Sequence, residues 1–107
     1  MTNVGAQLLG SWRTDPSDRW SLREYGDVSL HFDDQGNLVY TVHLPTKEQI
    51  MHLTYRVDGN WLVTNQPAAP REEKTQFYFT SDGRLAVKNP PPAPATLYVR
   101  TQGYASA

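Results

Sequence analysis

The sequence predicts an all-β fold in which eight antiparallel strands follow one another around a closed up-and-down barrel. Apolar and polar residues alternate over short segments, which is typical of strands with one buried face. Three connections share a glycine turn, and two longer connections are rich in proline, which ends strands because it lacks a backbone donor. A flat sheet of eight strands would leave two unpaired edges, and closure into a barrel removes both.

The shared turn has an aromatic residue followed four positions later by glycine, then one polar and one large apolar residue. It occurs at residues 32–38, 55–61 and 79–85. Glycine at this place suits a type I turn that closes into a bulge, since the place needs a positive φ. We therefore expect the first and last residues of each segment to face each other across a hairpin. The expected pairs are Phe32 with Leu38, Tyr55 with Trp61 and Phe79 with Leu85, and farther along Leu30 with Tyr40, Val28 with Val42, Leu53 with Val63 and Phe77 with Val87.

The strands are expected, in chain order, at residues 9–14, 26–32, 37–44, 49–57, 61–65, 73–80, 84–88 and 95–101. Between the first two strands, residues 15–26 are expected to form a short helical turn. Asp15 would be its N-cap, Pro16 its first helical position and Gly26 the residue beyond its end. An extended lead into the second strand is the alternative, because Trp20 and Leu22 also fit an alternating pattern.

A turn at residues 45–48 is expected between the first two hairpins. It would place Val42 beside Met51 and Tyr40 beside Leu53. These pairings would put the large apolar side chains on one inner face and polar side chains outside. The expected inner set is Val28, Leu30, Phe32, Leu38, Tyr40, Val42, Met51, Leu53, Tyr55, Trp61, Val63, Phe77, Phe79, Leu85, Val87, Leu97 and Val99. The expected outer set includes Ser29, His31, Thr41, His43, His52, Thr54, Arg56, Gln76 and Tyr78. A small open roll split into six and two strands is the structural alternative.

The composition is that of one soluble globular domain spanning residues 1–107. Of these residues 38% are hydrophobic and 20% charged, which suffices for a modest core. The net charge of -1, with Lys and Arg scattered singly, leaves no basic stripe to hold a phosphate backbone, so no nucleic-acid partner is expected. The absence of cysteine excludes disulfides, thiolate nucleophiles and cysteine-bound zinc. No stretch approaches the ~20 apolar residues of a membrane span, and the start lacks a signal-peptide pattern, so a cytoplasmic protein without membrane contact is expected.

Gly10-Ser11-Trp12 lies in the first expected strand and Arg100 in the last. This arrangement resembles the calycin barrels, namely lipocalins, fatty-acid-binding proteins and avidins, and most closely the small bacterial lipocalin-like domains. The resemblance spans about residues 8–101. It implies that Trp12 packs at the closed base of the barrel and that a late arginine lies across the indole. Arg100 would fill that role, with Arg13 as the alternative.

Aromatic side chains dominate the expected interior, which favours a pocket for a small apolar ligand oriented by tyrosine hydroxyls. The candidate ligand-binding residues are Tyr40, Tyr55, Trp61 and Phe77 inside the barrel and Trp20 and Tyr25 across one mouth. The alternative is a barrel filled by its own side chains and plugged at that mouth, because eight strands enclose an interior only just wide enough for them.

All three histidines fall on the expected outer face, where His43 faces Asp27. General-base chemistry at the barrel mouth would use these two residues or Glu24, with Ser29 as a distant nucleophile. No third ligand stands at a spacing suited to a metal. Exposed polar sheet surface explains these residues more simply, so no catalytic residue, metal ligand or cofactor is assigned.

We expect a binding module for a small, mostly apolar molecule. A rival hypothesis is an interaction protein with a filled barrel, which forms a homodimer through exposed apolar residues of the outer face. The residues considered for that face are Ile50, Tyr78, Tyr98 and Val39. A small enzyme working at the barrel mouth is the third hypothesis.

Overall fold

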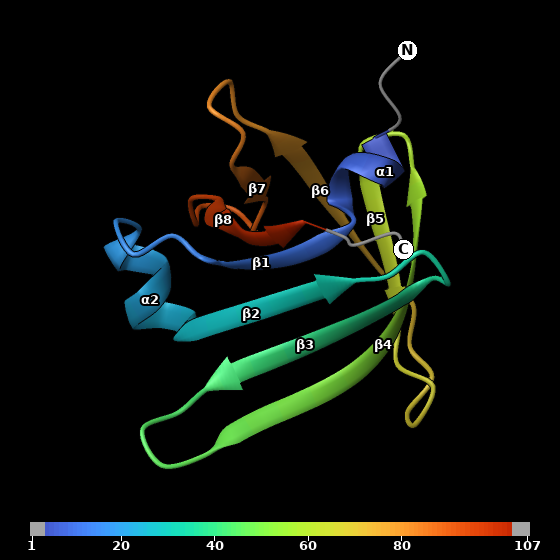
Figure 1. Cartoon of the computed structure of the whole chain (residues 1–107), viewed down its shortest axis with the longest axis horizontal. Helices are drawn as coiled ribbons and strands as arrows, with labels where there is room; N and C mark the ends of the chain where they lie inside the picture. Colours follow the sequence, from blue (N-terminus) through green and yellow to red (C-terminus); the bar gives the residue numbers. More distant parts are fainter. Residues whose placement is uncertain (1–3, 104–107) are drawn as a thin grey trace.

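A computed structural model describes residues 4–103 as a closed barrel of eight antiparallel strands, each hydrogen-bonded to the next and the last to the first (Figure 1). The strands are β1 (Gly10–Thr14), β2 (Asp27–Phe32), β3 (Asn37–His43), β4 (Glu48–Asp58), β5 (Trp61–Asn65), β6 (Glu73–Phe79), β7 (Leu85–Val87) and β8 (Thr96–Gly103). Helix α1 (Val4–Leu8) precedes β1, and helix α2 (Arg19–Tyr25) joins β1 to β2. The predicted barrel is confirmed, and the open roll does not form.

Successive connections alternate between the two ends of the barrel. The three glycine turns, at residues 33–36, 59–60 and 80–84, lie at one end, which we call the base. Helix α2 and the connections 44–47, 66–72 and 88–95 lie at the other end, the mouth. Short turns therefore close the base, while the mouth carries α2, the short turn 44–47 and the two longest strand connections, 66–72 and 88–95.

The first and third glycine turns have the predicted register. Phe32 pairs with Leu38 and Phe79 pairs with Leu85. In the first turn the Asp33 carboxylate accepts backbone N–H groups from Gln35 and Asn37 at 2.9 and 2.8 Å. In the third turn the Thr80 hydroxyl accepts the backbone N–H of Arg84 at 2.9 Å. A short polar acceptor at the second place of the segment thus supports the longer turn.

The predicted register of the second turn is wrong. Asp58 pairs with Trp61 around a two-residue loop, so Tyr55 faces Thr64 and Leu53 does not face Val63. The second place of this segment holds Arg56, which has no acceptor. A shift of three residues turns the other face of β5 inward, because side chains alternate with period two.

The consequence for β5 is that Leu62 is buried in the core and Trp61 is 39% exposed. Val63 lies opposite Arg56, outside the barrel, and is buried beside the ion pair that Arg56 forms with Glu72. Trp61 and Val63 therefore do not belong to the inner set.

The turn between β3 and β4 differs from the prediction by two residues. Tyr40 faces Met51 and Val42 faces Gln49 across a loop closed by a 2.9 Å hydrogen bond from the Leu44 N–H to the Lys47 carbonyl. An even shift leaves each side chain on its expected face. Leu53, now opposite Leu38, still packs on the core.

Strand β8 faces the opposite way from the prediction. Tyr98 is buried in the core cluster and pairs with Leu85, whereas Leu97 and Val99 lie on the other face. Arg100, two residues beyond Tyr98, is therefore on the same side as Trp12, its direct partner across the β1–β8 pair. The prediction of Tyr98 as an outer-face residue is wrong.

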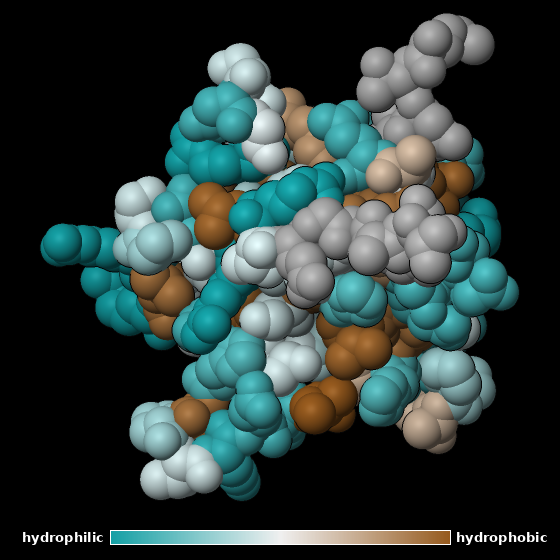
Figure 2. Space-filling view, in the orientation of Figure 1, coloured by the Kyte–Doolittle hydropathy of each residue, from teal (hydrophilic) through white to brown (hydrophobic). Residues whose placement is uncertain are grey.

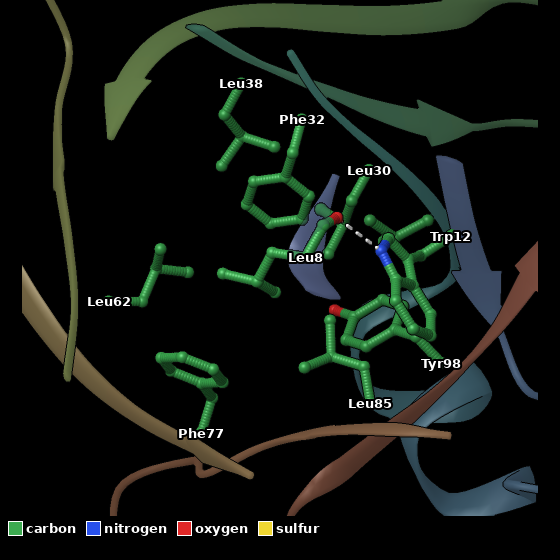
Figure 3. Close-up of a cluster of buried hydrophobic side chains, with 10 residues drawn as sticks. Leu8, Trp12, Leu30, Phe32, Leu38, Leu62, Phe77, Leu85 and Tyr98 are labelled. Atoms are coloured by element: carbon green, nitrogen blue, oxygen red, sulfur yellow. Dashed lines mark hydrogen bonds between the residues drawn. The ribbon is translucent and has the colours of Figure 1, made fainter. Parts of the chain in front are cut away.

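Trp12 sits in the core near the base. It is 1% exposed, and its indole N–H donates to the Leu8 carbonyl at 2.9 Å (Figure 3). The guanidinium carbon of Arg100 lies 4.2 Å from the indole centroid, so the expected cation–π contact is present. Leu8 itself is fully buried and comes from α1, a helix the sequence pattern did not indicate.

The predicted helix between the first two strands is confirmed, but it begins three residues later than expected for a cap at Asp15. Asp18 is the N-cap, and its carboxylate accepts the Ser21 N–H at 3.2 Å. Gly26, with a φ of 82°, follows the last turn as predicted. Asp15 instead binds Arg84 at 2.8 Å, an ion pair that spans β8 because that strand lies between β1 and β7.

Candidate functional site

The barrel contains a cavity of about 570 Å³ that extends to the β5–β6 connection at the mouth. All strands from β2 to β8 contribute to its wall. The residues that line it within the barrel are mainly apolar: Leu30, Leu38, Tyr40, Met51, Leu53, Leu62, Val87 and Tyr98. Figure 3 shows Leu38 and Leu62 on one side of the interior and Leu30 and Tyr98 on the other.

The edge of the cavity at the mouth is polar. Asn65, Gln66, Arg71 and Glu73 line it there, and Arg71 pairs with Glu73 at 3.6 Å. The Asn65 side chain accepts the backbone N–H of Arg71 at 2.9 Å, which fixes the start and end of the connection relative to each other. The cavity therefore runs from a polar entrance to an apolar interior.

Tyr98 brings a hydroxyl into this apolar interior. The residue is only 6% exposed, and Figure 3 shows its hydroxyl pointing from β8 toward the middle of the barrel. Burial raises its pKa, with smaller contributions from the phenol of Tyr40 and from Asp18. Within residues 4–103 no side chain or backbone group forms a hydrogen bond with this hydroxyl. Since no polar side-chain atom of the described residues is both fully buried and unpaired, this hydroxyl is reached from the cavity, and it is available to a bound molecule.

Tyr40 is the other cavity tyrosine. Burial raises its pKa, and Tyr25 of α2 raises it further. Tyr25 also contributes to the raised pKa of Tyr98, so its phenol lies within electrostatic range of both cavity tyrosines. Tyr25, on the helix at the mouth, thus contributes to the raised pKa of both cavity tyrosines.

The other interior aromatics predicted for the site lie elsewhere. The Tyr55 hydroxyl donates to the Asp33 carbonyl at 2.7 Å, and its ring packs edge-on against Phe32 with centroids 5.0 Å apart. Phe77 is a buried core residue that contacts Phe79 in the same manner, at 5.9 Å. Neither lines the cavity, and Trp61 faces outward.

Trp20 and Tyr25 both lie on α2 at the mouth, as expected. Their rings are in edge-to-face contact with centroids 5.8 Å apart, and Tyr25 is 43% exposed. Neither belongs to the cavity wall. Ser21 of the same helix is fully buried and donates to the Thr96 hydroxyl at 3.1 Å, which ties α2 to the start of β8.

Sequence reasoning missed Tyr98, the most informative residue of the cavity. A signal was present in the expected contact between Trp12 and Arg100. Trp12 is an interior residue, so an arginine that covers it must start from the inner face of β8, and Tyr98 must share that face. The polar entrance residues gave no such signal, because their position depends on the path of a loop.

The expected pair of Asp27 and His43 on the outer face does not form, and each residue binds another partner. Asp27 lies opposite His43 in the sheet, but its carboxylate binds Arg13 at 2.6 Å, and hydrogen bonding to that guanidinium lowers the pKa of Asp27. Glu24 pairs weakly with Arg23 at 3.9 Å. His43 instead contacts Ser29 and Glu48. Over the described part of the chain, no three His, Asp or Glu side chains stand close enough to hold a metal ion.

Comparison with protein-family models, with curated proteins and with solved structures found no match for this chain. Among residues 4–103, neither helix has the length and apolar character needed to cross a bilayer.

Proposed function

We propose that this protein is a lipocalin-like binding module that holds one small, mostly apolar molecule in the barrel cavity, with a hydrogen-bond acceptor of that molecule facing Tyr98. The observation that carries the proposal is the Tyr98 hydroxyl, which borders a mainly apolar cavity and has no hydrogen-bond partner among the described residues. A carbonyl or ether oxygen of the ligand would accept a hydrogen bond from this hydroxyl, which fixes the orientation of the ligand.

The size and polarity of the cavity support a small organic ligand. Its volume of about 570 Å³ lies within the range of roughly 300–1,000 Å³ typical of small-molecule sites. The walls offer apolar surface, while the entrance at Asn65 and Arg71 is polar. This favours a molecule that enters with its apolar part first.

The expected affinity follows from the size of such a ligand. A molecule of about 20 non-hydrogen atoms gains roughly 0.3 kcal/mol per atom, about 6 kcal/mol in total, which corresponds to a Kd of tens of micromolar. Burial of apolar surface, worth about 25 cal/mol per Å², supplies most of this free energy. The single hydroxyl contributes orientation and about 1 kcal/mol.

Two fluorescent probes test the proposal by titration. Prodan carries a ketone that can accept a hydrogen bond from Tyr98, whereas N-phenyl-1-naphthylamine has no oxygen. Both should bind saturably at one site. Tyr98→Phe should weaken prodan binding about five- to tenfold and leave the affinity for N-phenyl-1-naphthylamine unchanged. Tyr78→Phe removes a hydroxyl from an outer-face tyrosine that is 47% exposed and should change neither affinity.

A cavity-filling pair of variants separates the interior from the surface. Thr75 lines the cavity and Thr54 is exposed on the outer face of β4. Thr75→Phe should abolish binding of both probes, while Thr54→Phe should leave it intact. Binding that survives Thr75→Phe, or the absence of saturable binding to the unmodified protein, would contradict the proposed cavity site.

A further inference from the structure

A continuous chain of three side chains lies on the outer face of β2, β3 and β4, separate from the cavity. The Ser29 hydroxyl oxygen is 2.6 Å from Nε2 of His43, and Nδ1 of the same imidazole is 2.8 Å from the Glu48 carboxylate. The carboxylate can only accept, so Nδ1 carries the proton and Nε2 is left as an acceptor for the Ser29 hydroxyl. This is the order of a nucleophile, a general base and a group that orients the base.

The sheet itself holds these residues in place. Thr41 is the cross-strand partner of Ser29, and His43, two residues farther along β3, lies diagonally across from Ser29 on the same face. Glu48 is the direct partner of His43 across the β3–β4 pair. Regular strand pairing thus fixes all three positions, and no flexible loop carries any of them.

The three side chains are accessible to a reactant. Ser29 is half-buried, while the side chains of His43 and Glu48 are 24% and 57% exposed. Figure 2 looks onto the outer face of β2 and β3, where polar residues dominate and hydrophobic ones stand in separate patches. Ile50, which is 53% exposed, pairs with Thr41 and offers apolar surface in the row that contains Ser29.

Donors flank Ser29 on both neighbouring strands. Arg13 is its cross-strand partner on β1, and Thr41 its partner on β3. The guanidinium of Arg13 uses Nε and Nη2 to bind Asp27. Within the described residues, neither the Nη1 of Arg13 nor the Thr41 hydroxyl is engaged in a hydrogen bond. Both can donate toward negative charge that develops on a substrate oxygen beside Ser29.

We propose that Ser29 is an acyl-accepting nucleophile for small, uncharged, activated carboxylic esters. The Ser29 oxygen attacks the ester carbonyl carbon while its proton passes to Nε2 of His43, and Glu48 stabilises the imidazolium that results. The tetrahedral intermediate then breaks its bond to the leaving alcohol, which takes the proton from His43. Water repeats the sequence on acyl-Ser29, with His43 again as base, and releases the carboxylic acid.

A second serine–histidine pair provides an internal control. The Ser11 hydroxyl is 2.7 Å from Nδ1 of His31 on the same outer face, across the β1–β2 pair. His31 forms no ion pair with a carboxylate anywhere in residues 4–103. The Ser11–His31 pair therefore has a serine and a histidine but no carboxylate, and Ser11 should be much less reactive than Ser29.

Reaction with p-nitrophenyl acetate tests the proposal, with release of p-nitrophenolate and the site of acetylation, mapped by peptide mass spectrometry, as readouts. Acetyl-Ser29 should be found. Ser29→Ala and His43→Gln should each lower the rate about tenfold or more, and Glu48→Gln severalfold. Ser11→Ala and His31→Gln should stay within about twofold of the unmodified protein.

Acetylation confined to lysine, or a rate unchanged by Ser29→Ala, would overturn the proposal. Circular dichroism and thermal unfolding verify that each variant is folded, and Thr41→Val, which removes the donor beside Ser29, should lower the rate severalfold. Prodan binding in the barrel should be unaffected by Ser29→Ala, so the outcome is independent of the proposed ligand-binding function.

Discussion

Arg100 covers the indole of Trp12, with its guanidinium carbon 4.2 Å from the ring centroid, and the two residues come from the last and first strands of the barrel. The same guanidinium donates to the Leu9 carbonyl at 2.6 Å and to the Gln7 carbonyl. One side chain therefore joins β8, the start of β1 and the end of α1. The seam of the barrel is held by side-chain contacts as well as by strand pairing.

Replacement of Arg100 by methionine should weaken this seam. Arg100→Met keeps an unbranched apolar stem but loses the cation–π contact and two hydrogen bonds to carbonyls. We expect a loss of about 1–3 kcal/mol in the free energy of unfolding, measured in urea by far-UV circular dichroism. Arg23→Met, which removes an exposed pair 3.9 Å from Glu24, should change it by less than about 0.5 kcal/mol. Equal effects of the two substitutions would show that Arg100 adds nothing to closure.

Tyr98→Phe should not lower the stability of the ligand-free protein. The variant removes a hydroxyl that borders the cavity and has no hydrogen-bond partner among residues 4–103, while it keeps the ring in the core, so the free energy of unfolding should change by less than about 0.5 kcal/mol. Tyr78→Phe, at an exposed position, should leave it unchanged. A decrease with Tyr98→Phe would mean that the hydroxyl is satisfied in the free protein, and the argument for a ligand acceptor would lose its basis.

Asp15 should make the free energy of unfolding depend on pH in the acidic range. Hydrogen bonds from Arg84 and from the N–H and hydroxyl of Ser17 lower the pKa of its carboxyl, which is nearly buried. Because the folded-state pKa lies below the unfolded value of about 3.9, the carboxylate stabilises the fold above that value. This stabilisation is lost as the pH falls through the folded pKa.

Urea unfolding at a series of pH values measures this contribution. Asp15→Asn should lower stability at pH 7 and reduce the fall in stability between about pH 5 and pH 2. Asp58→Asn, at an exposed position at the end of β4, should leave the slope as it is. If Asp15→Asn does not reduce that fall, the ion pair with Arg84 does not contribute to stability.

Two turn glycines with the same conformation should respond alike to alanine. Gly36 and Gly83 have φ angles of 80° and 87°, a region that costs a residue with a Cβ about 1–2 kcal/mol. A Cβ on Gly36 would lie at an ordinary contact distance of 3.4 Å from the Tyr55 carbonyl oxygen, and a Cβ on Gly83 would have no heavy atom within 4 Å. Gly36→Ala and Gly83→Ala should therefore lower the free energy of unfolding by similar amounts, about 1–2 kcal/mol each in urea. No loss with either variant would contradict the positive φ of that turn.

The fold and most of the inner face could be predicted because alternation and turn spacing are local signals. The predicted strand register was wrong at the second glycine turn, between β4 and β5, which differs chemically from the other two. Asp33 and Thr80 accept backbone N–H groups, but Arg56 cannot, and Val57 after it packs on the core. The presence or absence of a short acceptor distinguishes the turns and was visible in the sequence.

The cavity could not be predicted in the same way. A cavity exists only where the volume that the strands enclose exceeds the volume of the side chains inside, and this difference is small. The alternation of apolar and polar residues carries no information on it. Tyr98 was assigned to the wrong face because Leu97 and Val99 alternate with it and are equally suitable for a core. Only a contact between distant residues, Trp12 and Arg100, resolves the choice.

The pairing of the first strand with the last also determines when the cavity can exist. Leu9 and Arg100 are 91 residues apart, so this seam is among the most distant contacts in the chain. During synthesis, a nascent chain whose strands β1 to β7 have left the ribosome carries two unpaired sheet edges and exposes its apolar interior. In this state β proteins aggregate most readily. Because Tyr98 belongs to β8, the strand that ends this exposure also delivers the hydroxyl, so the complete site forms only when the seam closes.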